Sequence, residues 1–153
     1  MEFVGGKREV GCVFCKLIHK KPKEDSKHFI LHRGQYNFVI MNRFPYNNGH
    51  LMVIPYTHIS SMDSLNDKAG LELFRLVSHA TRVMKKTLGA QGFNIGFNLG
   101  KAGGAGIEDH LHCHVIPRWL GDNNFWPILA ETKSMPEHLR TTYQRIKKAW
   151  KFI

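Results

Sequence analysis

Three histidines alternate with other residues in the stretch His110-Leu111-His112-Cys113-His114-Val115-Ile116-Pro117. We predict a strand over residues 111–117, in which alternate side chains share a face, so the three rings are expected to point the same way. Successive same-face residues stand about 6.5–7 Å apart, which separates the outer two by roughly 13 Å. One metal ion held by all three would need a marked bend, because metal–nitrogen bonds are only about 2.0–2.1 Å long. We therefore expect the three histidines to serve two separate sites.

Four further strands are predicted from short apolar runs at 29–31, 38–41, 51–54 and 93–99. The first two are joined at Arg33-Gly34-Gln35, as expected for two neighbouring strands. The run at 51–54 is continuously apolar and short, which favours a strand buried on both faces over a helix. Residues 93–99 alternate between apolar and polar side chains, and a glycine-rich loop follows at 101–106.

A long helix is predicted over Asp67–Leu88, where apolar residues recur at steps of three and four and form one stripe. That stripe consists of Phe74, Val77, Ala80, Met84 and Leu88. Asn66 can cap the start of the helix, and Gly89 can end it. A C-terminal helix is predicted over 136–153. Strands with helices inserted between them indicate an α+β fold with an antiparallel sheet of about five strands.

The 153 residues suit one domain, which we expect over 11–153, after a flexible N-terminal arm over 1–10. No run of about 18 apolar residues exists, so no transmembrane helix and no membrane partner are expected. The first ten residues lack the apolar segment of a signal peptide. Three cysteines are too few for a disulfide framework, so a cytoplasmic, reduced setting is expected.

The net charge of +10 and the sequence pI near 9.7 favour anionic partners such as nucleotides, nucleic acid or acidic membranes. Much of the excess lies in basic runs such as 19–23 and 147–148, for which plain solubility is the alternative explanation. The aromatic residues show no RNA-stacking pattern, so a nucleic-acid partner is not expected.

A pair of cysteines in Cys12-Val13-Phe14-Cys15 could belong to either of two kinds of site. Taken alone, a CxxC pair fits a redox motif or half of a zinc site. A thioredoxin-like redox motif needs a surrounding βαβ pattern, which is missing here. A zinc site needs two more ligands from elsewhere in the chain.

The alternating histidines resemble the pattern of the histidine triad (HIT) superfamily, in which His-x-His-x-His is followed by apolar residues. Two other segments resemble the second and third strands of that family: Asn42-Arg43-Phe44-Pro45 and Gly49-His50-Leu51-Met52-Val53-Ile54-Pro55. Two more look closest to its bacterial diadenosine tetraphosphate (Ap4A) phosphorylase-like branch: Gly92-Phe93-Asn94-Ile95-Gly96-Phe97-Asn98-Leu99-Gly100 and Pro117-Arg118-Trp119-Leu120-Gly121-Asp122-Asn123-Asn124-Phe125. The resemblance implies a HIT-like fold.

The resemblance implies a nucleophile at His112, with His114 and His50 as the other active-site histidines. A neutral imidazole is a good nucleophile toward phosphorus, and its neighbours can hydrogen-bond phosphate oxygens as charge develops. Asn42 matches the family position that binds the ribose hydroxyls, and Asn98 matches a position beside the phosphates. The glycine-rich loop either offers backbone N–H groups to phosphate or is a flexible turn. Its candidate residues are Gly104, Ala105 and Gly106.

In zinc-carrying HIT proteins, two histidines complete the CxxC pair: one shortly after the third strand and the first of the triad. These positions match His58 and His110. The resemblance therefore implies one structural zinc per chain, held by Cys12, Cys15, His58 and His110. Two free thiols are the alternative, as is a metalloenzyme that uses all three triad histidines. The need for a catalytic divalent metal is left open.

The resemblance implies a nucleotidyltransferase that cleaves dinucleoside polyphosphates through a covalent nucleotidyl-histidine, with inorganic phosphate as the favoured acceptor. Many hydrolytic members carry Gln and then Ser or Thr four and three residues before the first triad histidine. Gly106 and Ile107 stand there instead, which favours the phosphorylase-like branch. The alternatives are a hydrolase of dinucleoside polyphosphates or nucleoside phosphoramidates, and a non-catalytic nucleotide- or nucleic-acid-binding module. Family members are commonly dimers, so a homodimer is also implied.

Overall fold

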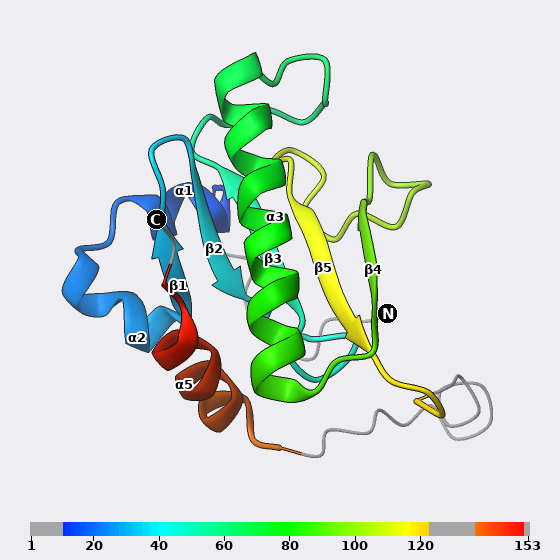
Figure 1. The fold of residues 1–153 in the computed structure, drawn as a ribbon. Helices are drawn as coiled ribbons and strands as arrows, with labels where there is room; N and C mark the ends of the chain where they lie inside the picture. The colour runs from blue at the N-terminus through cyan, green and yellow to red at the C-terminus, as the bar shows by residue number, and fades with distance from the viewer. Residues whose placement is uncertain (1–10, 123–136, 152–153) are drawn as a thin grey trace, which may run out of the picture.

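Five strands form one antiparallel sheet in the order β1-β2-β3-β5-β4 in the computed structural model (Figure 1), which describes residues 11–122 and 137–151. This confirms the predicted α+β fold; the arm predicted over 1–10 lies outside the described residues. In chain order the elements are α1 (Val13–Ile18), the 3-10 helix η1 (Pro22–Glu24), α2 (Asp25–His28), β1 (Ile30–Arg33), β2 (Asn37–Met41), β3 (Leu51–Pro55), α3 (Asp67–Leu88), β4 (Gly92–Phe97), β5 (Cys113–Arg118) and α5 (Leu139–Ala149).

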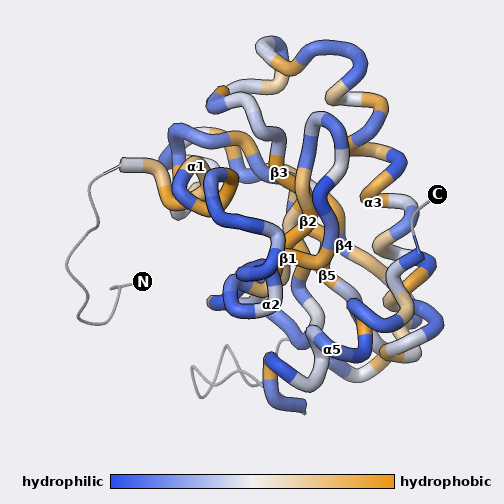
Figure 2. Tube along the Cα trace, turned by 90° about the vertical axis from the view of Figure 1, so that its left-hand side faces the viewer, coloured by the Kyte–Doolittle hydropathy of each residue, from blue (hydrophilic) through white to orange (hydrophobic). Residues whose placement is uncertain are grey.

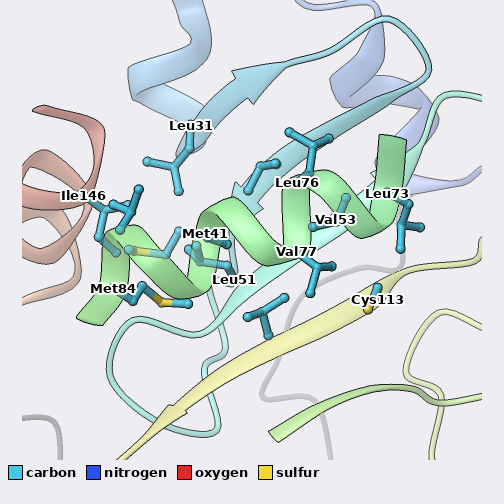
Figure 3. Close-up of a cluster of buried hydrophobic side chains, with 14 of the residues drawn as sticks. Leu31, Met41, Leu51, Val53, Leu73, Leu76, Val77, Met84, Cys113 and Ile146 are labelled. Atoms are coloured by element: carbon cyan, nitrogen blue, oxygen red, sulfur yellow. The ribbon is translucent and has the colours of Figure 1, made fainter. Parts of the chain in front are cut away.

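Alternation along the strands sorts the side chains onto two faces of the sheet. Odd-numbered residues such as Leu51 and Val115 join the larger core, which also contains the buried side chains of α3 and α5 (Figure 3). Even-numbered residues such as Met52 and Ile54 form a smaller cluster with Phe14 of α1. Figure 2 shows α1 and α3 on opposite sides of the strands. The even-numbered positions of β3 and β5 therefore lie on the face that α3 leaves uncovered.

Helix α3 has the predicted bounds, because both of its ends carry the expected caps. The Asn66 side chain accepts a hydrogen bond from the Ala69 N–H at 2.9 Å, and Gly89 adopts the left-handed conformation with φ of 64°. The predicted stripe was wrong at Phe74, whose side chain is 64% exposed. Neighbouring helix residues point about 100° apart, so Leu73 takes the inward position and Phe74 faces outward.

Strand β5 begins at Cys113, so the strand predicted over 111–117 was wrong at its start, and His110 and His112 both lie just before it. The chain just before β5 turns toward the segment after β3, where the Leu111 N–H donates to the Ile59 carbonyl at 2.6 Å. That hydrogen bond takes the chain out of the ladder with β4, whose pairing ends at Phe97 and Cys113. Just before the strand, the Nδ1 atom of His110 lies within 3.6 Å of the sulfur atoms of Cys12 and Cys15.

The C-terminal helix α5 is shorter than predicted, although part of the 136–153 prediction lies outside the described residues. It starts after His138, whose side chain accepts a hydrogen bond from the Arg140 N–H, and it ends where Trp150 becomes extended. Thr142, Tyr143 and Ile146 are its buried residues. Among the described residues, no helix combines the length and apolar character that crossing a membrane requires.

Candidate functional site

Three buried histidines, His50, His112 and His114, gather on the uncovered face of the sheet where β3 and β5 begin. Met52 pairs with His114 across the two antiparallel strands. The rings of His112 and His114 meet edge to face at 4.8 Å between centroids, and those of His50 and His114 lie 5.0 Å apart. The structure thus brings the three predicted active-site histidines together.

The tautomer of His112 follows from one hydrogen bond. Its Nδ1 lies 2.8 Å from the main-chain oxygen of His110. A carbonyl can only accept, so Nδ1 carries the proton and Nε2 presents an unprotonated lone pair. Burial lowers the pKa of His112, and this keeps the ring neutral near pH 7. A neutral imidazole with a free Nε2 is the form required of a nucleophile.

A chain of donors fixes the tautomers of His50 and His114. The Tyr46 N–H donates to His50 Nδ1 at 3.1 Å, so the proton of His50 sits on Nε2. His50 Nε2 lies 2.9 Å from His114 Nδ1 and donates to it. His114 therefore carries its own proton on Nε2, a buried atom with no hydrogen-bond partner among the described residues. Such a donor can bind an anionic oxygen of a substrate.

His114 is kept neutral by its surroundings. Burial and the neighbouring His112 lower the pKa of His114 to about 4. Near pH 7 it therefore acts as an N–H donor and not as a cation. His112 and His114 together offer one nucleophilic nitrogen beside one oriented N–H donor, which suits attack on a phosphoryl group.

The remaining candidate residues for nucleotide contacts lie around this centre. Asn42 follows β2 and places its Nδ2 3.3 Å from His50 Nδ1, while its Oδ1 accepts from the Phe44 N–H. The Asn98 side chain donates to the Gly104 carbonyl at 3.4 Å and so joins β4 to the glycine-rich loop. Two loop amides already donate within the loop, namely those of Gly104 and Ala105. Of the three loop candidates, Gly106 is the one whose amide makes no such hydrogen bond among the described residues.

Arg118, in the segment that follows the triad, is engaged within the protein. Its Nε and Nη2 each donate to Asp122 at 2.9 Å, and its Nη1 donates to Asn94. The Asp122 carboxylate also accepts from Asn47. This ion pair closes the turn after β5, and residues 123 and 124 of that segment lie outside the described residues.

A second group, the metal cluster, consists of Cys12, Cys15, His58 and His110, whose ligand atoms all lie within 4.8 Å of one another. His110 Nδ1 lies 3.3 Å from Cys12 Sγ and 3.6 Å from Cys15 Sγ, and His58 Nδ1 lies 3.2 Å from Cys15 Sγ. A tetrahedral ion with bonds of about 2.3 Å to sulfur and 2.0–2.1 Å to nitrogen separates its ligands by about 3.6 Å. The four side chains fit a bound metal.

Both histidines of the metal cluster have a partner on the opposite side of the ring. His110 Nε2 donates to the Pro55 carbonyl at 2.9 Å, which leaves Nδ1 deprotonated and directed at the two sulfurs. His58 Nε2 faces the Asp109 carboxylate at 3.7 Å. Oxygen partners of this kind orient metal-binding imidazoles in proteins.

The HIT domain family model matches residues 23–119, well over half of the sequence. The chain belongs to the HIT family. A curated HIT relative, the AP-4-A phosphorylase of Mycobacterium tuberculosis (strain CDC 1551 / Oshkosh), is 40% identical over 126 residues, which cover 82% of this chain but only 65% of that protein. An uncharacterized HIT-like protein of Methanocaldococcus jannaschii is 31% identical over 111 residues, covering 72% of this chain and 81% of its own length.

Solved HIT structures share this fold over most of their length. A Zn-bound histidine triad family protein from Mycobacterium smegmatis superposes with a TM-score of 0.72 at 25% identity, covering 90% of this chain and 91% of its own. A hypothetical histidine triad nucleotide-binding protein from Sulfolobus tokodaii gives a TM-score of 0.68 at 26% identity, covering 90% and 88%. The HIT-like fold expected from the sequence is thereby confirmed.

Two aromatic residues that contact histidines of the candidate site were not predicted from the sequence. Tyr46 stacks on His50 with 5.0 Å between ring centroids and a 25° tilt, in addition to its main-chain donation. Phe14, between the two cysteines, contacts the rings of both His110 and His112. Tyr46 follows Pro45 in a segment that resembles the family, but that signal does not identify the histidine it contacts.

Proposed function

We propose that this HIT protein is a nucleotidyltransferase that cleaves dinucleoside polyphosphates, moving a nucleotidyl group first to His112 and then to inorganic phosphate. The observation that carries the proposal is the orientation of His112, whose Nδ1 is bound to the His110 carbonyl so that Nε2 is available to attack. The similarity to an AP-4-A phosphorylase supports the choice of substrate class and acceptor.

The proposed reaction has two balanced halves. In the first, the Nε2 lone pair of His112 attacks the α-phosphorus, a P–N bond forms, and the P–O bond to the leaving nucleoside polyphosphate breaks. The His110 carbonyl stabilises the positive charge that develops on the ring, since it accepts from Nδ1–H throughout. His114 Nε2–H donates to a phosphoryl oxygen that gains negative charge. In the second, an oxygen of phosphate attacks, the P–N bond breaks, and a nucleoside diphosphate leaves.

Water competes with phosphate as the acceptor, and hydrolysis is then the outcome. Phosphate is anionic and competes with water only where the protein binds it, for which the net charge of +10 and the Gly106 amide are favourable. Chromatography of the products from Ap4A with and without millimolar phosphate tests this. ADP plus ATP is expected. AMP plus ATP, unchanged by phosphate, would make the protein a hydrolase.

We also propose that the metal is zinc, one per chain, with a structural role. Thiolate and imidazole ligands in this number suit zinc, and a similar solved structure is described as Zn-bound. The ion would be held by Cys12, Cys15, His58 and His110, where it would tie the N-terminal end of α1 to the chain just before β5. Elemental analysis of protein purified without chelator is expected to give about one zinc per chain; protein free of zinc would contradict the assignment.

The oligomeric state and the cellular location of the protein remain predictions. A homodimer and a cytoplasmic location follow from the family resemblance and the composition. Strand β4 forms an edge of the sheet, and its Ile95 is 49% exposed, which is compatible with an association through that edge. Analytical ultracentrifugation of the purified chain would give its oligomeric state.

A further inference from the structure

The side chain of Phe14 lies between the metal cluster and the proposed nucleophile. Phe14 is only 3% exposed. Its ring meets that of His110 edge to face, with centroids 5.5 Å apart and planes at 85°. It also packs on the His112 ring, with centroids 5.2 Å apart and planes at 59°. One buried ring therefore contacts both a metal-cluster histidine and the histidine proposed to react.

His112 is held on two sides, and both contacts originate at the metal cluster. The first is the hydrogen bond from Nδ1 to the main-chain oxygen of His110, itself a cluster residue. The second is the Phe14 ring, which comes from between Cys12 and Cys15 on α1. The hydrogen bond sets the tautomer of the ring, and the Phe14 contact sets its tilt within the site.

The N-terminal turn of helix α1 depends on the metal cluster for its position. The helix has six residues and no side-chain cap at its N-terminus, and a helix this short is not stable by itself in water. The C-terminal end of α1 is held by Arg33, which donates to the carbonyls of Leu17 and Ile18. The N-terminal turn is attached by the two cysteine sulfurs and by the burial of Phe14 in the smaller cluster. Loss of the metal would therefore loosen the N-terminal turn, which carries Phe14.

From these contacts we infer that Phe14 is a positioning residue, through which occupancy of the metal cluster sets the orientation of the His112 ring and so keeps its Nδ1 on the His110 carbonyl. The inference rests on the proposed function only in taking His112 as the nucleophile. It gives the metal a role beyond stability: the ion touches no substrate, but it keeps the nucleophile aligned.

The test compares Phe14→Leu with a matched control, Phe38→Leu, in zinc-loaded protein. Phe38 belongs to the same cluster and is fully buried, but its ring stacks on Tyr56, 5.8 Å away, and not on a histidine. Because small misplacements of a reacting group are costly, we expect Phe14→Leu to lower kcat about ten-fold or more, with little change in KM. Phe38→Leu should share the loss of thermal stability but keep kcat.

Nitrogen-15 NMR of the imidazoles provides a readout that needs no turnover. Wild-type His112 should show the Nδ1–H tautomer, and either Phe14→Leu or removal of zinc by chelation should raise the Nε2–H fraction. Phe14→Met, which keeps the volume better, should behave likewise if the leucine variant folds poorly. An unchanged His112 tautomer in zinc-loaded Phe14→Leu, or a raised KM with unchanged kcat, would overturn the inference. Retained turnover in His112→Ala would instead overturn the proposed function.

Discussion

Main-chain groups determine what each histidine of the site can do. The His110 carbonyl leaves the Nε2 of His112 free to attack, and the Tyr46 N–H makes His50 a donor to His114. His114 is thereby left with a buried Nε2–H that no described protein group accepts. The three imidazoles are chemically identical, and the hydrogen-bond partner of each ring determines which of its nitrogens carries the proton.

Substitution of His114 tests the donor role. His114→Ala should lower kcat by about 10²-fold, since removal of one oriented donor to a transition-state oxygen has effects of about this size. Binding of the nucleotide should change little, because the proposed ribose contact is made by Asn42. Steady-state kinetics on Ap4A would measure both, with the exposed His19→Ala as the control. Equal kinetics in the two variants would exclude His114 from the reaction.

Among the secondary-structure elements, α3 holds the β1–β2 turn through one carboxylate. Glu72 accepts hydrogen bonds from the main-chain N–H groups of Gln35, Tyr36 and Asn37, at 2.7–2.8 Å, and from the Asn37 side chain. Glu72→Ala should lower the free energy of unfolding by about 2–3 kcal/mol, because it leaves these donors without their charged acceptor. Urea denaturation would measure the loss. Asp67→Asn, at an exposed acid of the same helix, should change little by comparison.

The Glu72 carboxylate should also make the free energy of unfolding depend on pH. Partial burial by itself raises the pKa of Glu72, but the hydrogen bonds from Asn37, Gln35 and Tyr36 outweigh it and leave the pKa below its usual value. The stabilisation contributed by Glu72 is therefore complete above the pKa of about 4.3 that it has in the unfolded chain. It is lost as the pH falls through the lower pKa that it has in the folded protein. The stability difference between wild type and Glu72→Gln should shrink from pH 7 to pH 3. A difference that stays constant would contradict this.

Several elements could be predicted from the sequence because their determinants are local. The caps Asn66 and Gly89 fix the bounds of α3, and apolar runs mark the strands. Local patterns were insufficient at Phe74, since Leu73 beside it fits the inward position equally well and only the packing decides. The short helices α1 and α2 were not predicted, because they are stabilised by contacts with distant parts of the chain.

Much of the candidate site depends on contacts between residues far apart in the sequence. Strand alternation predicts that His112 and His114 lie together, and the family resemblance is needed to assign His110 to the cysteines. No sequence pattern indicates that Phe14 packs on His112, because 98 residues separate them and only the folded sheet brings them together. The positive charge is informative about anionic partners but not about where they bind.

For the molecule as a whole, the metal cluster joins the N-terminal end of α1 to the sheet. Removal of the metal by a chelator should lower the melting temperature by about 5 °C or more, because the ligands then lose their common partner. Differential scanning calorimetry would measure the shift. Cys12→Ser should have a similarly lowered melting temperature without chelator, and adding chelator should lower it little further. A wild-type melting temperature insensitive to chelation would contradict a structural metal.

The covalent step at His112 is tested most directly by detecting the intermediate. Protein mixed with Ap4A in the absence of phosphate, quenched rapidly and digested under mildly basic conditions, should carry one adenylyl group on the peptide that contains His112. Mass spectrometry would locate it, and added phosphate should remove it with release of ADP. His112→Ala should carry no adduct and should lose nearly all turnover. Turnover at the wild-type rate in His112→Ala, or an adenylyl group on a different residue, would contradict the account.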